Sequence, residues 1–141
     1  MSEKNKEIAR LFINGLNQGN LNIFDELVAP NFVDRTTLPG ADSTRKGWKE
    51  AYEKREINPF PDLHFHIEEQ IAEGDLVVTL SKGHGTHQGE FMGIPATGKE
   101  VTGINITIFR ITDGKIIERW TAFDSLSFLA QLGGLTHLGN S

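Results

Sequence analysis

The chain has 141 residues and no cysteine, and its 14 basic and 19 acidic residues give a formal net charge of −5. This length suits one domain with its own core, and the lack of cysteine excludes disulfides, thiolate metal sites and a cysteine nucleophile. Proteins whose main partner is a nucleic acid usually carry a basic face, which this acidic balance does not favour. Neither a signal peptide nor an apolar run of membrane-spanning length is visible. We therefore expect a cytoplasmic protein without nucleic-acid or membrane partners.

The amino-terminal segment has the pattern of a helix with one buried face. Apolar residues recur at i, i+3 and i+4 from Ile8 through Leu11 to Leu16. Ser2 suits the start of this helix and Gly19 suits its end.

A second, shorter helix is predicted over residues 21–28, because the apolar pattern resumes there and Pro30 would end it. Residues 31–34 then predict a short strand that leads into a loop.

A third helix is predicted to begin near Asp42 or Ser43. Trp48 and Tyr52 share one face of it, which we expect to be buried. The proline-containing segment 58–62 ends the helical pattern.

The second half of the chain predicts an antiparallel sheet. Alternating apolar and polar residues predict strands over residues 63–71, 76–81, 101–111 and 116–123. Tight turns are predicted at 73–75 and 112–115, and the stretch 84–91 is less regular. Asp124 and Ser125 open a closing helix. Helices followed by an antiparallel sheet predict an α+β fold in a single domain, residues 1–141, with an ordered core of about residues 3–133.

A set of short motifs in the second half resembles one known family. They are Phe60-Pro61-Asp62-Leu63, Glu73-Gly74-Asp75, the stretch from Gly85 to Pro95, Thr97-Gly98-Lys99, Phe109-Arg110-Ile111, Asp113-Gly114-Lys115-Ile116, the run from Glu118 to Asp124, and Gln131-Leu132-Gly133. In this order they are similar to the SnoaL-like polyketide (ester) cyclases of the nuclear transport factor 2-like superfamily. The resemblance implies a curved antiparallel sheet wrapped by the amino-terminal helices into a cone with an internal pocket, commonly in a homodimer. It leaves the reaction open, since the superfamily includes cyclases, isomerases, dehydratases, epoxide hydrolases and proteins with no known activity.

Several positions depart from the cyclase pattern. Those enzymes use an aspartate on the last strand as general acid/base, and an ungapped alignment places Thr121 there. A family histidine on the preceding strand falls on Thr107, a family asparagine falls on Asp34, and many relatives have histidine in place of Arg35. The resemblance therefore does not carry the catalytic residues over intact.

Two carboxylates are candidates for a relocated base. Asp124 precedes Ser125 and an apolar-periodic stretch, so it suits a helix N-cap and could also serve the pocket. Asp34 follows a strand near the expected mouth of the pocket. Burial there would raise the pKa of this carboxyl, whereas pairing with Arg35 would lower it, and an exposed ion pair is the alternative.

The histidines offer a weaker case. His64 and His66 share a strand face at a spacing that two metal ligands could use, but the further ligands such a site needs are missing. His84 is a candidate for proton transfer because histidine side chains commonly take that role, although an exposed loop position is the simpler interpretation. We expect no metal and no cofactor.

The remaining candidate site residues would bind the ligand. Trp48, Phe109 and Trp120 could form pocket walls or belong to the core. Hydrogen-bond donors could come from Arg35, Asn105, Thr107, Arg119 and Thr121.

Two functions remain open. One is an enzyme that removes a proton beside a carbonyl of a small, largely apolar, polyketide-like molecule and stabilises the enolate, as in cyclisation or isomerisation. The other is a binding or accessory module with the same pocket and no turnover. A pocket carboxylate with a raised pKa would favour the enzyme.

Apolar residues on both faces of strand 101–111 also predict a homodimer through the outer face of the sheet.

Overall fold

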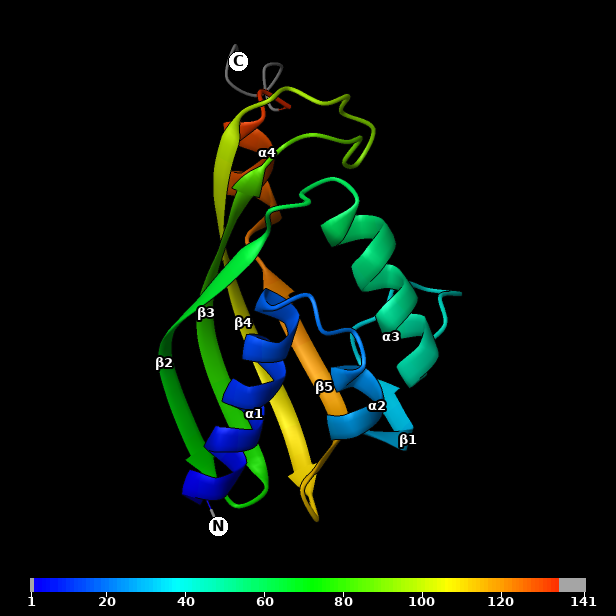
Figure 1. Cartoon of the computed structure of the whole chain (residues 1–141), viewed down its shortest axis with the longest axis vertical. Coiled ribbons are helices and arrows are strands. Elements are labelled where there is room, and N and C mark those ends of the chain that lie inside the picture. Colours follow the sequence, from blue (N-terminus) through cyan, green and yellow to red (C-terminus); the bar gives the residue numbers. More distant parts are fainter. Residues whose placement is uncertain (1, 135–141) are drawn as a thin grey trace.

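A mixed five-stranded sheet is the frame of the molecule, and its strands follow the order β1-β5-β4-β3-β2 (Figure 1). The computed structural model describes residues 2–134, and the predicted ordered core lies within them; residues 135–141 lie outside the described residues. The strands are β1 (Val28–Asp34), β2 (His64–Glu73), β3 (Leu76–Thr86), β4 (Glu100–Thr112) and β5 (Lys115–Phe123). β2 to β5 are antiparallel neighbours, as the sequence predicts, and β1 adds a parallel pairing with β5. The predicted α+β class is confirmed.

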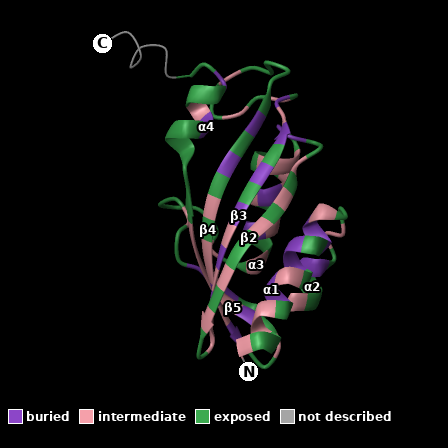
Figure 2. Ribbon diagram, turned by 90° about the vertical axis from the view of Figure 1, so that its left-hand side faces the viewer, coloured by how far each residue is buried: buried purple, intermediate pink, exposed green. Residues whose placement is uncertain are grey.

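Helices cover one face of this sheet and close one end of it. They are α1 (Ser2–Asn17), α2 (Ile23–Leu27), α3 (Arg45–Tyr52), a π-helical turn η1 (Glu53–Ile57) and α4 (Ser125–Gln131). α1 and α2 lie on the same side of the strands, and α4 lies near the end where β4 begins (Figure 2). Within residues 2–134, no helix combines the length and the apolar character needed to cross a membrane.

The first strand begins earlier than the sequence predicts. Residue 28 already belongs to β1, so Pro30 lies inside a strand instead of ending a helix. A proline is tolerated there because β1 is at the edge of the sheet. Proline has no backbone N–H, and an edge strand has no neighbouring strand on its solvent side to which that N–H would donate.

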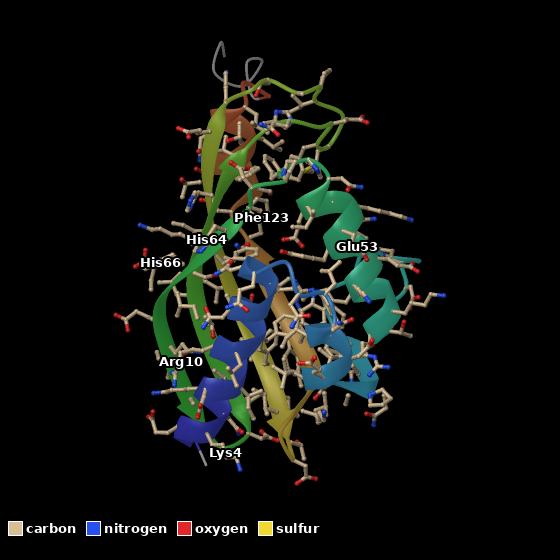
Figure 3. All side chains as sticks on the ribbon, viewed as in Figure 1. Lys4, Arg10, Glu53, His64, His66 and Phe123 are labelled. Atoms are coloured by element: carbon tan, nitrogen blue, oxygen red, sulfur yellow. The ribbon has the colours of Figure 1, made fainter. Side chains whose placement is uncertain are left out.

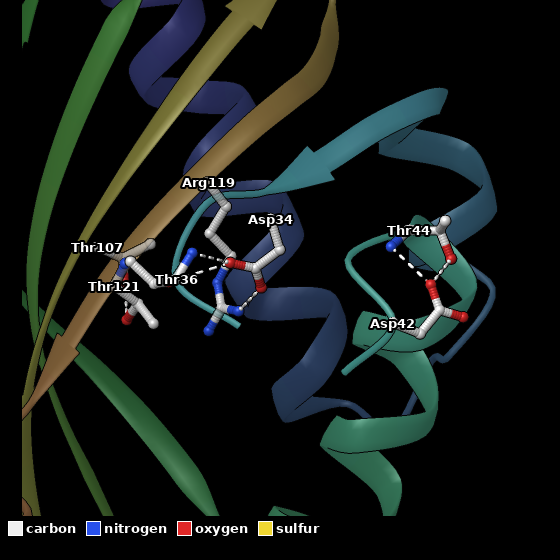
Figure 4. Close-up of polar contacts among 7 residues, drawn as sticks. All are labelled: Asp34, Thr36, Asp42, Thr44, Thr107, Arg119 and Thr121. Carbon is white, nitrogen blue, oxygen red and sulfur yellow. Dashed lines mark hydrogen bonds and ion pairs between the residues drawn. The ribbon is translucent and has the colours of Figure 1, made fainter. Parts of the chain in front are cut away.

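The start of α3 is explained by side-chain capping, and the buried face of α1 by its apolar pattern. Thr44 caps α3, since its side chain accepts a hydrogen bond from the backbone N–H of Gly47, and Asp42 accepts bonds from the Thr44 backbone and hydroxyl (Figure 4). α1 turns Ile8 and Leu16 inward as predicted, but Leu11 is 50% exposed and lies on the other side of the helix.

Aromatic side chains fill the space between the helices and the sheet. Phe12 of α1 lies 4.9 Å from Trp48 of α3 and 5.8 Å from Phe109 of β4, measured between ring centroids. Phe32 of β1 stacks on Trp48 at 5.0 Å. These contacts hold α1, α3 and β4 at fixed separations, and Trp48, with its large buried area, lies at their centre. A second cluster, which includes Phe60 and Phe128, packs α4 against the far end of the sheet.

Candidate active site

A cavity of about 70 Å³ lies between the helices and the inner face of β3, β4 and β5. It is lined by Phe12, Ile13, Leu16, Trp48, Tyr52, Glu56, Phe65, Thr79, Ser81, Asn105, Thr107, Phe109, Arg119 and Thr121.

The two sides of the cavity differ in chemistry. α1 and α3 contribute apolar and aromatic side chains, such as Phe12 and Trp48, whereas the strands contribute mainly hydroxyl and amide groups. Strand alternation explains the polar side, because Asn105 and Thr107 are two residues apart on β4, and Thr121 is the register partner of Thr107 on β5. A ligand here would meet apolar surface on one side and hydrogen-bonding groups on the other.

Among the described residues that line this cavity, Glu56 of the π-helical turn η1 carries the only carboxylate. Burial raises the pKa of Glu56 to about 7, and the positive charge of Arg119 opposes this rise. π-helical turns within helices are frequent at functional sites, where they redirect side chains. A carboxyl group with this pKa can both accept and return a proton near neutral pH.

Arg119 links the cavity to a buried ion pair. One of its guanidinium nitrogens lies 2.6 Å from Oδ2 of Asp34, whose side chain is 4% exposed (Figure 4). Asp34 also accepts hydrogen bonds at 3.0 Å from the backbone N–H and the hydroxyl of Thr36. The guanidinium lies 4.7 Å from the ring of Trp48. Asp34 therefore fixes the position of Arg119 and offsets part of its charge.

Tyr52 precedes the π-helical turn and also lines the cavity. It is 2% exposed, and its hydroxyl has no hydrogen-bond partner among residues 2–134. Burial, together with the neighbouring Glu56 carboxylate, raises the pKa of this phenol, so it stays protonated.

The hydroxyl groups of Thr107 and Thr121 form a hydrogen bond with each other. Their hydroxyl oxygens lie 3.0 Å apart across β4 and β5, and either one could be the donor (Figure 4). Two neutral hydroxyls thus occupy the positions where the resemblance expects a histidine and an aspartate.

The structure brings part of the predicted site together. The predicted residues that line the cavity are Trp48, Asn105, Thr107, Phe109, Arg119 and Thr121. Asp34 lies behind Arg119 and pairs with it, whereas Arg35 pairs instead with Glu118 at 2.7 Å. The Asp34–Arg35 pairing considered from the sequence is therefore wrong, because consecutive strand residues point to opposite faces.

The other predicted residues lie away from the cavity. Trp120 is opposite Ile108 on the outer face of the sheet, where the guanidinium of Arg110 lies 5.9 Å from its ring. Asp124 is exposed and caps α4, with Oδ1 accepting a hydrogen bond of 3.1 Å from the Ser127 backbone N–H. Its predicted N-cap role is confirmed.

Exposed histidines gather on the outer face of β2 and β3. His84 is the register partner of His64, and their rings lie 5.7 Å apart; His64 and His66 project from β2 (Figure 3). Among residues 2–134 no three His, Asp or Glu side chains are grouped so that they could hold a metal ion.

Sequence reasoning missed the two polar side chains on the helical side, Tyr52 and Glu56. Trp48, Tyr52 and Glu56 are spaced at i, i+4 and i+8, which places them on one face of a helix. That spacing was the available signal. The charged run from Glu53 to Glu56 resembles a solvated helix end, and for this reason Glu56 was not considered as a residue of the site.

Comparison with known proteins gives a consistent family. The sequence model of the SnoaL-like polyketide cyclase family matches residues 6–132. The nogalonic acid methyl ester cyclase of Streptomyces nogalater is 28% identical over 128 residues, which cover 86% of this chain and 91% of that protein.

Solved structures agree with this match. IdmH, a candidate polyketide cyclase from Streptomyces antibioticus, has a TM-score of 0.82 and 32% identity, and the similarity covers 92% of this chain and 98% of that one. AclR, a candidate hydroxylase from Streptomyces galilaeus, has a TM-score of 0.84 and 26% identity, covering 94% and 98%.

Proposed function

This chain belongs to the SnoaL-like polyketide cyclase family, and we propose that it cyclises a small polyketide-like substrate with Glu56 as the general base. The observation that carries the proposal is a carboxylate on the cavity wall whose pKa is raised to about 7. This was the feature that separated the enzyme hypothesis from the binding-module hypothesis.

The reaction we propose is an intramolecular aldol closure. Glu56 takes the proton from a carbon beside a carbonyl, and the C–H electron pair becomes the enolate. The enolate carbon then attacks a second carbonyl carbon of the same molecule, which forms the C–C bond and an alkoxide. Protonated Glu56 returns the proton to that alkoxide, so the step needs no redox partner and leaves the base as it began.

The surroundings of Glu56 support this role. The cationic Arg119 lines the same cavity and can stabilise negative charge on the substrate oxygen, and Asn105 can donate from the strand side. The aromatic residues of α1 and α3 are buried and would limit the access of water to a bound substrate, which would strengthen these interactions.

Asp34 has a supporting role in this proposal. It is ion-paired with Arg119 and is not among the residues lining the cavity, so we assign it to positioning Arg119 rather than to proton transfer. Asp124 caps a helix from an exposed position, and His84 lies on the outer face, so both are poorer bases than Glu56.

The test is turnover with a panel of aromatic polyketide esters, beginning with the compounds for which the relatives are named, nogalonic and aklanonic acid methyl esters. Wild type should convert at least one of them. Glu56→Gln should lower kcat at least 100-fold, as expected for a lost general base. Glu53→Gln, a matched change on the same helical turn at a residue that does not line the cavity, should keep the wild-type rate.

Two outcomes would count against the proposal. Full activity of Glu56→Gln would show that another group takes the proton. Tight binding of the esters without any turnover by wild type would favour a non-catalytic binding module with the same pocket.

We also propose that the protein acts in the cytoplasm as a homodimer, with the outer face of the sheet in the interface. Ile104 and Ile106 on this face are 43% and 47% exposed, and an apolar surface of this kind is typical of a protein–protein contact.

A further inference from the structure

We propose that the hydroxyl of Tyr52, on the same helical segment as the base Glu56, donates a hydrogen bond to the substrate oxygen that becomes negatively charged. The inference rests on the proposed function, since a donor at this place matters only where an enolate or alkoxide forms. It also narrows the ligand to molecules that carry an acidic carbon next to a carbonyl group, whose oxygen can accept this hydrogen bond.

The first support is the state of the Tyr52 hydroxyl. A buried phenol O–H normally finds a partner, yet this one has none among residues 2–134 while the ring lines the cavity. An unsatisfied buried donor lowers the stability of the free protein. A ligand oxygen in the cavity would supply the missing acceptor.

The second support is the placement of Tyr52 relative to Glu56. The two residues are four positions apart, one at the end of α3 and the other in η1, and both line the cavity. A base and a donor on one helical segment can face the acidic carbon and the oxygen of the neighbouring carbonyl group in the same substrate. Arg119 lines this cavity too, and its charge would add to the stabilisation of that oxygen.

The protonation states are compatible with this division of roles. Burial keeps the phenol of Tyr52 protonated, while Glu56 titrates near neutral pH. Tyr52 therefore remains a donor throughout the pH range in which Glu56 can act as a base.

The experiment measures binding, so it does not depend on finding the substrate. p-Nitrophenol and p-nitrotoluene have nearly the same shape and share the nitro group, and they differ in one substituent: a phenolic oxygen that can accept from Tyr52 in the first, a methyl group in the second. Affinities for both are measured with wild type and Tyr52→Phe at about pH 6, where Glu56 is protonated as it would be after accepting a proton. The absorbance of p-nitrophenol reports in addition whether it binds as the phenolate.

Wild type should prefer p-nitrophenol by about tenfold or more, and Tyr52→Phe should lose this preference while binding p-nitrotoluene unchanged. Thermal unfolding of Tyr52→Phe without ligand should occur at the same temperature or higher, because an unsatisfied buried group has been removed. A purely structural tyrosine would not give this combination of higher stability and lost preference.

Failure of this inference is separable from failure of the proposed function. Equal preference in wild type and Tyr52→Phe, or no preference in wild type, including binding of neither probe, overturns the role of Tyr52. Polyketide turnover that depends on Glu56 would still stand in that case. Loss of the preference in Tyr52→Phe without polyketide turnover by wild type would support the oxygen site and refute the cyclase.

Discussion

In the middle of the sheet, the inner and outer faces reverse the usual distribution of polar and apolar residues. In the middle of the sheet the inner face carries Thr79, Ser81, Asn105, Thr107 and Thr121, whereas the outer face carries Val78, Leu80, Ile104, Ile106 and Ile108. An antiparallel sheet with one solvated face normally turns its apolar side chains inward. Here the hydroxyl and amide groups face the cavity and the aliphatic groups face outward.

Stability alone does not explain this arrangement. Burying polar groups is costly unless they form hydrogen bonds, and the Thr107–Thr121 pair shows one way in which they do. Exposed aliphatic residues likewise leave favourable burial unused. The difference agrees with our proposals that the inner face contacts the polar groups of a ligand and that the outer face contacts a second subunit. The following changes test each half of that statement.

The largest effect is expected on the outer face. Ile106→Glu places a carboxylate in the middle of the proposed dimer interface, where it would be buried and unpaired in each subunit. We expect wild type to be dimeric at micromolar concentration and the variant to be monomeric by light scattering. Leu11→Glu, on an exposed side of α1, is the control and should stay dimeric. A monomeric wild type would refute the assignment of this face.

Asp34→Asn tests the buried ion pair between Asp34 and Arg119, which lies behind the inner face of the sheet. Removing one charge of a buried ion pair costs about 3 kcal/mol of unfolding free energy, which denaturant titration would detect. The freed charge of Arg119 should also lower the pKa of Glu56, so the acid limb of the kcat/KM profile moves to lower pH by roughly one unit.

This outcome distinguishes two roles for Asp34. A rate loss of at least tenfold across the whole profile, with no shift of the acid limb, would instead identify Asp34 as the base.

Glu56 also predicts a pH dependence of stability that needs no substrate. Its pKa is raised from 4.5 to about 7 in the folded protein, so the folded state binds more protons than the unfolded state between these values. Unfolding free energy should therefore be unaffected by this group below pH 4.5 and fall as pH rises toward 7, by about 3 kcal/mol at most.

Glu56→Gln should remove this fall, because the amide does not titrate. Chemical denaturation of both proteins from pH 4.5 to 8 is the measurement. Parallel curves for the two proteins would show that Glu56 ionises as freely in the folded chain as in the unfolded one.

The smallest effect is expected at the exposed carboxylate outside the cavity. Asp124→Ala removes the side-chain acceptor for the Ser127 N–H at the start of α4, which typically costs about 1 kcal/mol. Asp124→Ser keeps a capping oxygen and should restore the melting temperature. Unchanged stability with lost turnover would assign Asp124 to catalysis instead.

The order and type of most elements could be predicted from the sequence alone. The 3.6-residue pattern around Leu16, the alternation along strand 101–111 and the capping signal at Asp124 are all local features, and the structure contains the predicted elements. The strand residues Asn105, Thr107 and Thr121 line the cavity, on the faces that the family resemblance implies; a period of two explains why Asn105 and Thr107 share a face.

Tertiary structure decided where the carboxylates of the site lie. Asp34 pairs with Arg119 of a strand distant in sequence, and the register between β1 and β5 that makes them neighbours is not a local property. Likewise, Pro30 could enter β1 only because that strand is at the edge of the sheet. Glu56 acquires its raised pKa from desolvation by the surrounding protein. Desolvation depends on everything packed around a group, so a local pattern of charges cannot reveal it.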